Sequence, residues 1–139
     1  MLPGLLLAAA LAAPLDVALK VDPAPCREPL TVEVAFEAAV AGKGVTSFAG
    51  ACPWPDPGLP LAHRWKGALP GAEPRTLRRL RYVFRDGRGK VVASLFKDPA
   101  GVVDPKGLQG VVLHAVPVPG PPGFQLEHRV ELEIGTRRD

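Results

Sequence analysis

Residue types that carry chemistry are scarce in this sequence of 139 residues, which has one methionine, two cysteines, three histidines and two serines. A single methionine excludes a methionine-rich copper site, and no two histidines or cysteines have the close spacing of zinc motifs. Neither Ser47 nor Ser94 lies in a nucleophile-elbow sequence. We therefore expect no metal site, no cofactor and no enzymatic activity.

The sequence also lacks any stretch suited to a long helix. Seventeen prolines and fifteen glycines are spread along it without a regular period, and both residue types destabilise helices. The missing period excludes a collagen and a solenoid. The length suits one domain. A net charge of +3 favours solubility and weak attraction to anionic surfaces, without indicating nucleic acid.

The first twelve residues, MLPGLLLAAALA, carry no charged side chain. This apolar run is shorter than the roughly 20 residues that span a bilayer, and its Ala-Leu-Ala end fits a signal-peptidase site. We interpret residues 1–12 as a signal peptide and residues 13–139 as the mature domain, without a transmembrane span after cleavage. The protein would be exported to the periplasm, the cell surface or the medium. The alternative is an apolar first strand or helix of the domain.

The two cysteines are Cys26 and Cys52. In an exported protein an even pair predicts a disulfide. This bond would close a loop of about 27 residues and stabilise the fold by roughly 3 kcal/mol. In a cytosolic protein the same residues would be buried thiols.

Alternating apolar and polar residues predict β-strands along most of the chain. The clearest signal is in residues 76–96, where two alternating runs flank Asp86-Gly87-Arg88-Gly89, a typical hairpin turn. Further strands are expected at residues 15–22, 30–40, 45–52, 108–118 and 125–134. Six to seven strands without a helix predict an all-β fold, an antiparallel β-sandwich.

Two segments carry a resemblance to a known family. Residues 82–92, YVFRDGRGKVV, resemble the central hairpin of bacterial immunoglobulin-like domains, and residues 121–126, PPGFQL, are similar to the entry into one of their late strands. The resemblance implies an immunoglobulin-like sandwich and brings no active site with it. The chain departs from antibody domains in its cysteine spacing and in lacking a tryptophan between the cysteines.

Residues 53–74 contain six prolines and both tryptophans. We interpret this segment as a long loop without secondary structure, a kind of loop that is usually functional or disordered. Because tryptophan and arginine are enriched at interface centres, we predict that Trp54, Arg64 and Trp65 bind a partner. In the alternative interpretation, both indoles plug an open end of the sandwich.

Basic residues cluster around the central hairpin. One interpretation is an anionic-polymer site for nucleic acid, polysaccharide or lipid head groups, formed by Arg75, Arg79, Arg81, Arg85 and Arg88. The interpretation we favour is a charge ladder between neighbouring strands. It would pair Arg79, Arg81 and Arg85 with Glu127, Glu131 and Glu133 of the last strand.

Together these patterns predict a non-enzymatic, exported binding or accessory domain of the cell envelope. Its partner would be an unidentified protein or envelope component, and we do not expect nucleic acid. The alternative function is binding of an anionic polymer through the arginine cluster. A small secreted hydrolase or protease inhibitor is a third class, because long loops can hide sites.

Overall fold

The computed structural model describes residues 14–134 except 41, 43, 70–72, 105–107 and 122. The predicted signal peptide therefore lies outside the described residues. Nine strands form within them: β1 (Leu15–Val21), β2 (Leu30–Val40), β3 (Gly44–Trp54), β4 (Leu61–Leu69), β5 (Arg75–Arg85), β6 (Val91–Lys97), β7 (Gly101–Val103), β8 (Leu108–Gly120) and β9 (Gly123–Ile134). The described part of the chain holds no helix long and apolar enough to cross a membrane.

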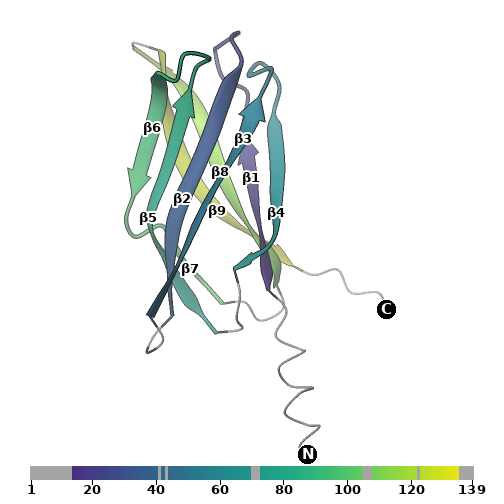
Figure 1. The fold of residues 1–139 in the computed structure, drawn as a ribbon, viewed down its shortest axis with the longest axis vertical. Helices are drawn as coiled ribbons and strands as arrows, with labels where there is room; N and C mark the ends of the chain where they lie inside the picture. Colours follow the sequence, from purple (N-terminus) through teal and green to yellow (C-terminus); the bar gives the residue numbers. More distant parts are fainter. Residues whose placement is uncertain are drawn as a thin grey trace, which may run out of the picture.

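The strands form two sheets that face each other (Figure 1). The first sheet has the order β4-β1-β8-β9, and the second has the order β3-β2-β5-β6, with β7 paired to β5. Strands β1 and β8 run parallel, whereas the other pairs are antiparallel. The predicted all-β sandwich is confirmed. The described residues form more strands than predicted, because β4 lies in the segment that we expected to be a loop and β7 lies between two predicted strands.

Alternation along each strand sends every second side chain into the space between the sheets. On β2, Val32, Val34 and Phe36 are buried, while the intervening Glu33 and Glu37 point outward. The largest fully buried side chains are Trp54, Tyr82 and Phe84. The outward side chains of β2 and its neighbours therefore do not pack in the core.

The central hairpin is confirmed as β5 and β6, which are antiparallel neighbours. The carboxylate of Asp86 accepts hydrogen bonds from the backbone N–H groups of Arg88 at 2.9 Å and Lys90 at 3.0 Å. These donors hold the pKa of Asp86 below its usual value. Gly89 has a φ of +83°, a conformation that L side chains rarely adopt. The sequence of this turn therefore fixes its geometry.

The interpretation of residues 53–74 as one long loop is wrong. Strand β3 continues to Trp54, and β4 pairs antiparallel with β1 from Leu61 to Leu69. Prolines stand at positions 60 and 70, on either side of β4, and none lies within it. Proline removes a backbone donor and breaks a strand only where that donor is needed. Here the prolines set the limits of the strand.

The two tryptophans are buried to different degrees. Trp54 is only 2% exposed, its Nε1 donates to the Leu59 carbonyl at 3.0 Å, and its ring meets that of Phe84 edge-on at 5.8 Å. Trp65 is partly buried against the core and meets the Phe48 ring at 5.2 Å. Both indoles contribute to the core, as the alternative interpretation expected.

The predicted disulfide is absent, and both cysteines are free. Cys52 points from β3 into the core, where burial raises the pKa of its thiol. Cys26 lies half-buried in the connection before β2, and its thiol donates to the Glu28 carbonyl at 3.6 Å. An even number of cysteines does not set the distance between two side chains, and a disulfide requires Cβ atoms about 4 Å apart.

Candidate functional site

The outer face of the second sheet carries small residues beside arginines. Strand register places Ala49, Ala35 and Arg81 in one row across β3, β2 and β5. The row on one side of it contains Ala51, Glu33 and Val83, and the row on the other contains Ser47, Glu37 and Arg78. Small side chains on β3 and β2 next to long ones on β5 make this face uneven.

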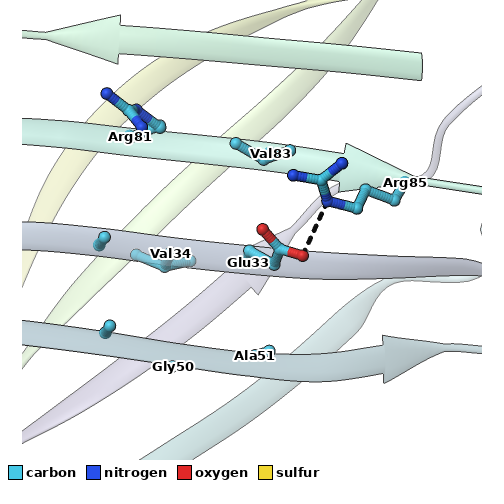
Figure 2. Close-up of a pocket in the computed structure, with 9 residues that line it drawn as sticks. Glu33, Val34, Gly50, Ala51, Arg81, Val83 and Arg85 are labelled. Atoms are coloured by element: carbon cyan, nitrogen blue, oxygen red, sulfur yellow. Dashed lines mark hydrogen bonds and ion pairs between the residues drawn. The ribbon is translucent and has the colours of Figure 1, made fainter. Parts of the chain in front are cut away.

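This unevenness produces a shallow groove, which we call the alanine groove. It consists of two adjoining hollows of about 430 Å³ and about 380 Å³ that share Ala35, Ala49 and Arg81. Figure 2 shows the larger hollow, with Arg81, Val83 and Arg85 on one strand and Glu33 on the next. The remaining lining residues are Val34, Phe36, Glu37, Ser47, Phe48, Gly50, Ala51 and Arg79.

Ion pairs between β5 and β2 stand at both ends of the alanine groove. Arg85 Nε lies 2.9 Å from a Glu33 oxygen (Figure 2). Arg78 Nε lies 3.1 Å and Arg79 Nε 3.9 Å from the two oxygens of Glu37. Both arginines reach Glu37 because the β2–β5 register shifts here, and Arg79 adopts a φ of +52°.

A charge ladder is therefore present, but its predicted partner strand is wrong. The acidic residues that pair with Arg79 and Arg85 are Glu37 and Glu33 of β2, not Glu127, Glu131 and Glu133 of β9. Strands β5 and β9 belong to different sheets, so their outward faces point in opposite directions. The sequence marked both sets of glutamates as outward, but it could not show which set lies beside β5.

Arg81 stands between these pairs and has no ion pair within the described residues. Its neighbours in the row are Ala35 on β2 and Phe96 on β6, neither of which carries a charge. Its guanidinium carbon lies 6.0 Å from the centre of the Phe96 ring, and the Phe96 side chain is itself exposed. This distance suits a weak cation–π interaction that orients the guanidinium. The alanine groove thus has one exposed cation available to a ligand.

The other arginines of the predicted cluster do not join this surface. Arg75 is 3% exposed, and its burial lowers the pKa of the guanidinium. Arg88 lies in the β5–β6 turn, beyond the end of β5. The predicted set of five arginines thus reduces to Arg79, Arg81 and Arg85 on the sheet face.

Arg64 lies on the outer face of the first sheet, away from both indoles. Its guanidinium donates to both oxygens of Glu133, at 2.7 and 2.6 Å, and lies 3.2 Å from Asp16. Hydrogen bonding to Glu133 raises the pKa of Arg64 and lowers that of the Glu133 carboxyl. A Cβ on Gly110 would lie 3.0 Å from Glu133, so the glycine leaves space for this contact across β8.

We expect Arg64→Ala to destabilise the protein by about 1 kcal/mol at pH 7, the value of a partly exposed ion-pair network. The pKa of Asp16 is lowered, first by the Gly67 backbone N–H, and that of Glu133 by Arg64. Carboxyl groups with lowered pKa values stabilise the fold above about pH 4 and lose this contribution as pH falls. The difference in unfolding free energy between wild type and variant should therefore shrink at pH 3 in urea titrations.

The control for this measurement is Arg129→Ala, because Arg129 is exposed on β9. It should change the unfolding free energy by less than about 0.5 kcal/mol at either pH. A cost of Arg64→Ala that is the same at pH 7 and pH 3 would contradict the assignment to these carboxylates.

The histidines make structural contacts. His114 is 5% exposed and its ring nitrogens lie 2.7 Å from Glu131 and 2.8 Å from Asp22. His128 accepts or donates a 2.7 Å hydrogen bond with the Tyr82 hydroxyl, and burial lowers its pKa. Within the described residues, no group of three or more histidine, cysteine or acidic side chains could hold a metal ion.

Comparisons with known proteins identify a fold and no family. No family model and no curated protein matches the sequence. The structure is similar to the crystal structure of a proposed cell adhesion protein from Bacteroides ovatus, with a TM-score of 0.50 and 10% sequence identity. The match covers 91% of this chain and 47% of the other, so this chain spans about half the length of that protein. At this identity the similarity concerns the fold alone.

Proposed function

We propose that this chain is a non-enzymatic, exported binding domain of the cell envelope that contacts its partner through the alanine groove. One observation carries the proposal. Arg81 is an exposed cation without a carboxylate partner among the described residues, beside a hollow floored by alanines and between two glutamate–arginine pairs. The alanines of β2 and β3 that face outward do not pack in the core. Larger polar residues at these positions would fill the hollow.

Two further features support the proposal without identifying the partner. The apolar residues 1–12 suggest export. The similar structure from Bacteroides ovatus belongs to a proposed adhesion protein, a class that acts by binding. We also infer that the sandwich is of the immunoglobulin-like type, because the hairpin that carries this resemblance forms half of the second sheet, with β5 inside it and β6 at its edge.

Binding of a densely charged polymer is a second candidate. Four arginines and two glutamates, at positions 78, 79, 81, 85, 33 and 37, give this face a positive balance. The argument against this candidate is that Glu33 and Glu37 pair with three of these arginines and so neutralise part of the positive charge. The earlier prediction that Arg64 and the two tryptophans bind a partner stays a prediction; of these three residues, Arg64 is the exposed one.

The test compares the binding of fluorescently labelled wild type, Arg81→Gln and Arg129→Gln to washed envelope fragments of the native host at 0.15 M salt. Removing a charge that makes hydrogen bonds to a ligand costs roughly 1.5–3 kcal/mol, so Arg81→Gln should lower the affinity about tenfold or more. Arg129 is exposed on the opposite outer face, and Arg129→Gln should bind like wild type. Equal binding by all three proteins would overturn the proposed site.

Export is tested separately by the mass of the native protein from fractionated cells. Envelope protein that lacks residues 1–12 supports the proposal. Protein that retains Met1 and is recovered only from the cytosol would contradict export, whatever the binding assay shows.

A further inference from the structure

We propose that the ligand of the alanine groove is a saccharide that carries isolated carboxylate groups, such as an envelope polysaccharide with alternating uronic acid and neutral sugars. This inference rests on the proposed function and adds the chemical class of the partner. It follows from the hydrogen-bonding groups of the groove, from the spacing of its charges and from the backbone of β2 at its centre, which is hydrogen-bonded on both sides.

The groove offers donors and acceptors together. Arg81 and Arg85 present guanidinium N–H groups, whereas Glu33 and Glu37 present carboxylate oxygens that only accept. A sugar hydroxyl both donates and accepts, so it can bond to either kind of side chain without leaving a polar group unpaired. The alanine side chains between these groups give the C–H face of a sugar ring an apolar surface to cover.

The spacing of the charged side chains in the groove favours a ligand whose carboxylates are separated by neutral units. In the part of the chain that the structure describes, Arg81 is the groove cation without an ion pair, and on β2 the row of Ala35 is flanked at two residues' distance by Glu33 and Glu37. At about 3.3 Å per residue, each glutamate row lies roughly 7 Å from the Arg81 row. A polymer with a negative charge at every such step would bring its next charges to the Glu33 and Glu37 rows, where the arginines are already paired with these glutamates. A ligand with neutral units between its charges needs no further cation there.

The backbone beneath the groove argues against an extended peptide. Strand β2 is hydrogen-bonded to β3 on one side and to β5 on the other. Peptides that recognise sheets usually add to a free edge through backbone hydrogen bonds, and a peptide added to the edge strand β3 would lie beside the sheet rather than over Ala35 and Arg81. Recognition here depends on side chains alone, which suits a polyhydroxylated ligand.

The experiment uses the full chain and three hexasaccharides in isothermal titration calorimetry at 0.15 M salt. A hyaluronan hexasaccharide has one carboxylate per disaccharide, a chitin hexasaccharide is neutral, and a heparin hexasaccharide is densely charged. We expect saturable binding of hyaluronan, at least tenfold weaker binding of chitin, and no tighter binding of heparin. Tighter, strongly salt-dependent heparin binding would overturn the inference in favour of a polyanion site, and so would failure of hyaluronan to bind.

Three variants test whether the saccharide binds in the alanine groove. Arg81→Gln removes the free cation, and Ala49→Leu fills the floor without changing charge. Each should weaken hyaluronan binding about tenfold or more, whereas Arg129→Gln should leave it unchanged. A similar loss in Arg129→Gln would show general charge attraction and overturn the inference. All three positions are exposed, so we expect each variant to fold. Thermal unfolding of each variant checks that the affinity was measured on folded protein.

The same variants separate this inference from the proposed function. If envelope binding depends on Arg81 but hyaluronan does not bind, the ligand class is wrong and the proposed site stands. If hyaluronan binding depends on Arg81 but envelope binding does not, the saccharide site stands and the proposed envelope role fails.

Discussion

Trp54→Ala should cost roughly 3–5 kcal/mol of unfolding free energy, the usual cost of removing a buried aromatic side chain. The indole is 2% exposed and packs edge-on against Phe84, and its N–H bonds the Leu59 carbonyl. The substitution leaves a cavity at the end of β3 and removes that donor. Urea titration should show the loss, and the melting temperature should fall by roughly 10 °C or more.

Leu59→Ala is the matched control for Trp54→Ala. The Leu59 side chain is 58% exposed although its carbonyl accepts the indole hydrogen bond. Truncating it should change stability by no more than about 0.5 kcal/mol. If Trp54→Ala were as mild as the control, the indole would be a surface residue, and the core assignment would be wrong.

Gly50→Ala should destabilise the protein by roughly 1–3 kcal/mol, the cost of overpacking a core. A Cβ on Gly50 would lie 2.6 Å from Cε2 and 2.8 Å from Nε1 of the Trp65 indole. The Trp65 ring is held in turn against Phe48 and by His63, whose ring lies 4.7 Å away. The indole therefore cannot move aside without disturbing the contact between β3 and β4.

A double-mutant cycle with Trp65→Leu tests this explanation of the Gly50→Ala effect. If the clash with the indole is the cause, Gly50→Ala should cost much less in the Trp65→Leu background, with a coupling of roughly 1 kcal/mol or more. Gly87→Ala, where a Cβ would meet no atom within 4 Å, is the control. An equal cost in both backgrounds would contradict the packing account.

The sequence predicted elements whose signals are local. The β5–β6 hairpin was identifiable because Asp86 and Gly89 specify the turn and alternation marks both arms. Strand β2 was likewise delimited by its alternating valines. Strand β4 was missed because six prolines dominated residues 53–74. The usable signal was the proline-free stretch between Pro60 and Pro70, in which Leu61, His63 and Trp65 alternate with exposed residues.

Long-range relations could not be predicted in the same way. Outward glutamates were recognised on two strands, but sheet order alone decides that Glu33 and Glu37, rather than those of β9, lie beside β5. The disulfide prediction was wrong for the same reason, since the number of cysteines in a sequence does not determine the distance between them. The alanine groove was missed because its floor is two alanines from strands paired in register, Ala35 and Ala49. Neither alanine carries a chemical signal in the sequence.

The most direct test of the proposed site is site-specific photo-crosslinking to envelope fragments. A photoreactive side chain is placed at Ala49, on the alanine groove, or at Ala62, an exposed alanine on the outer face of the other sheet. Both positions lie on edge strands, so the probe is equally accessible at each. The proposal predicts crosslinks from position 49 that Arg81→Gln abolishes, and few from position 62. Equal crosslinking at both positions, or a preference for position 62, would contradict it.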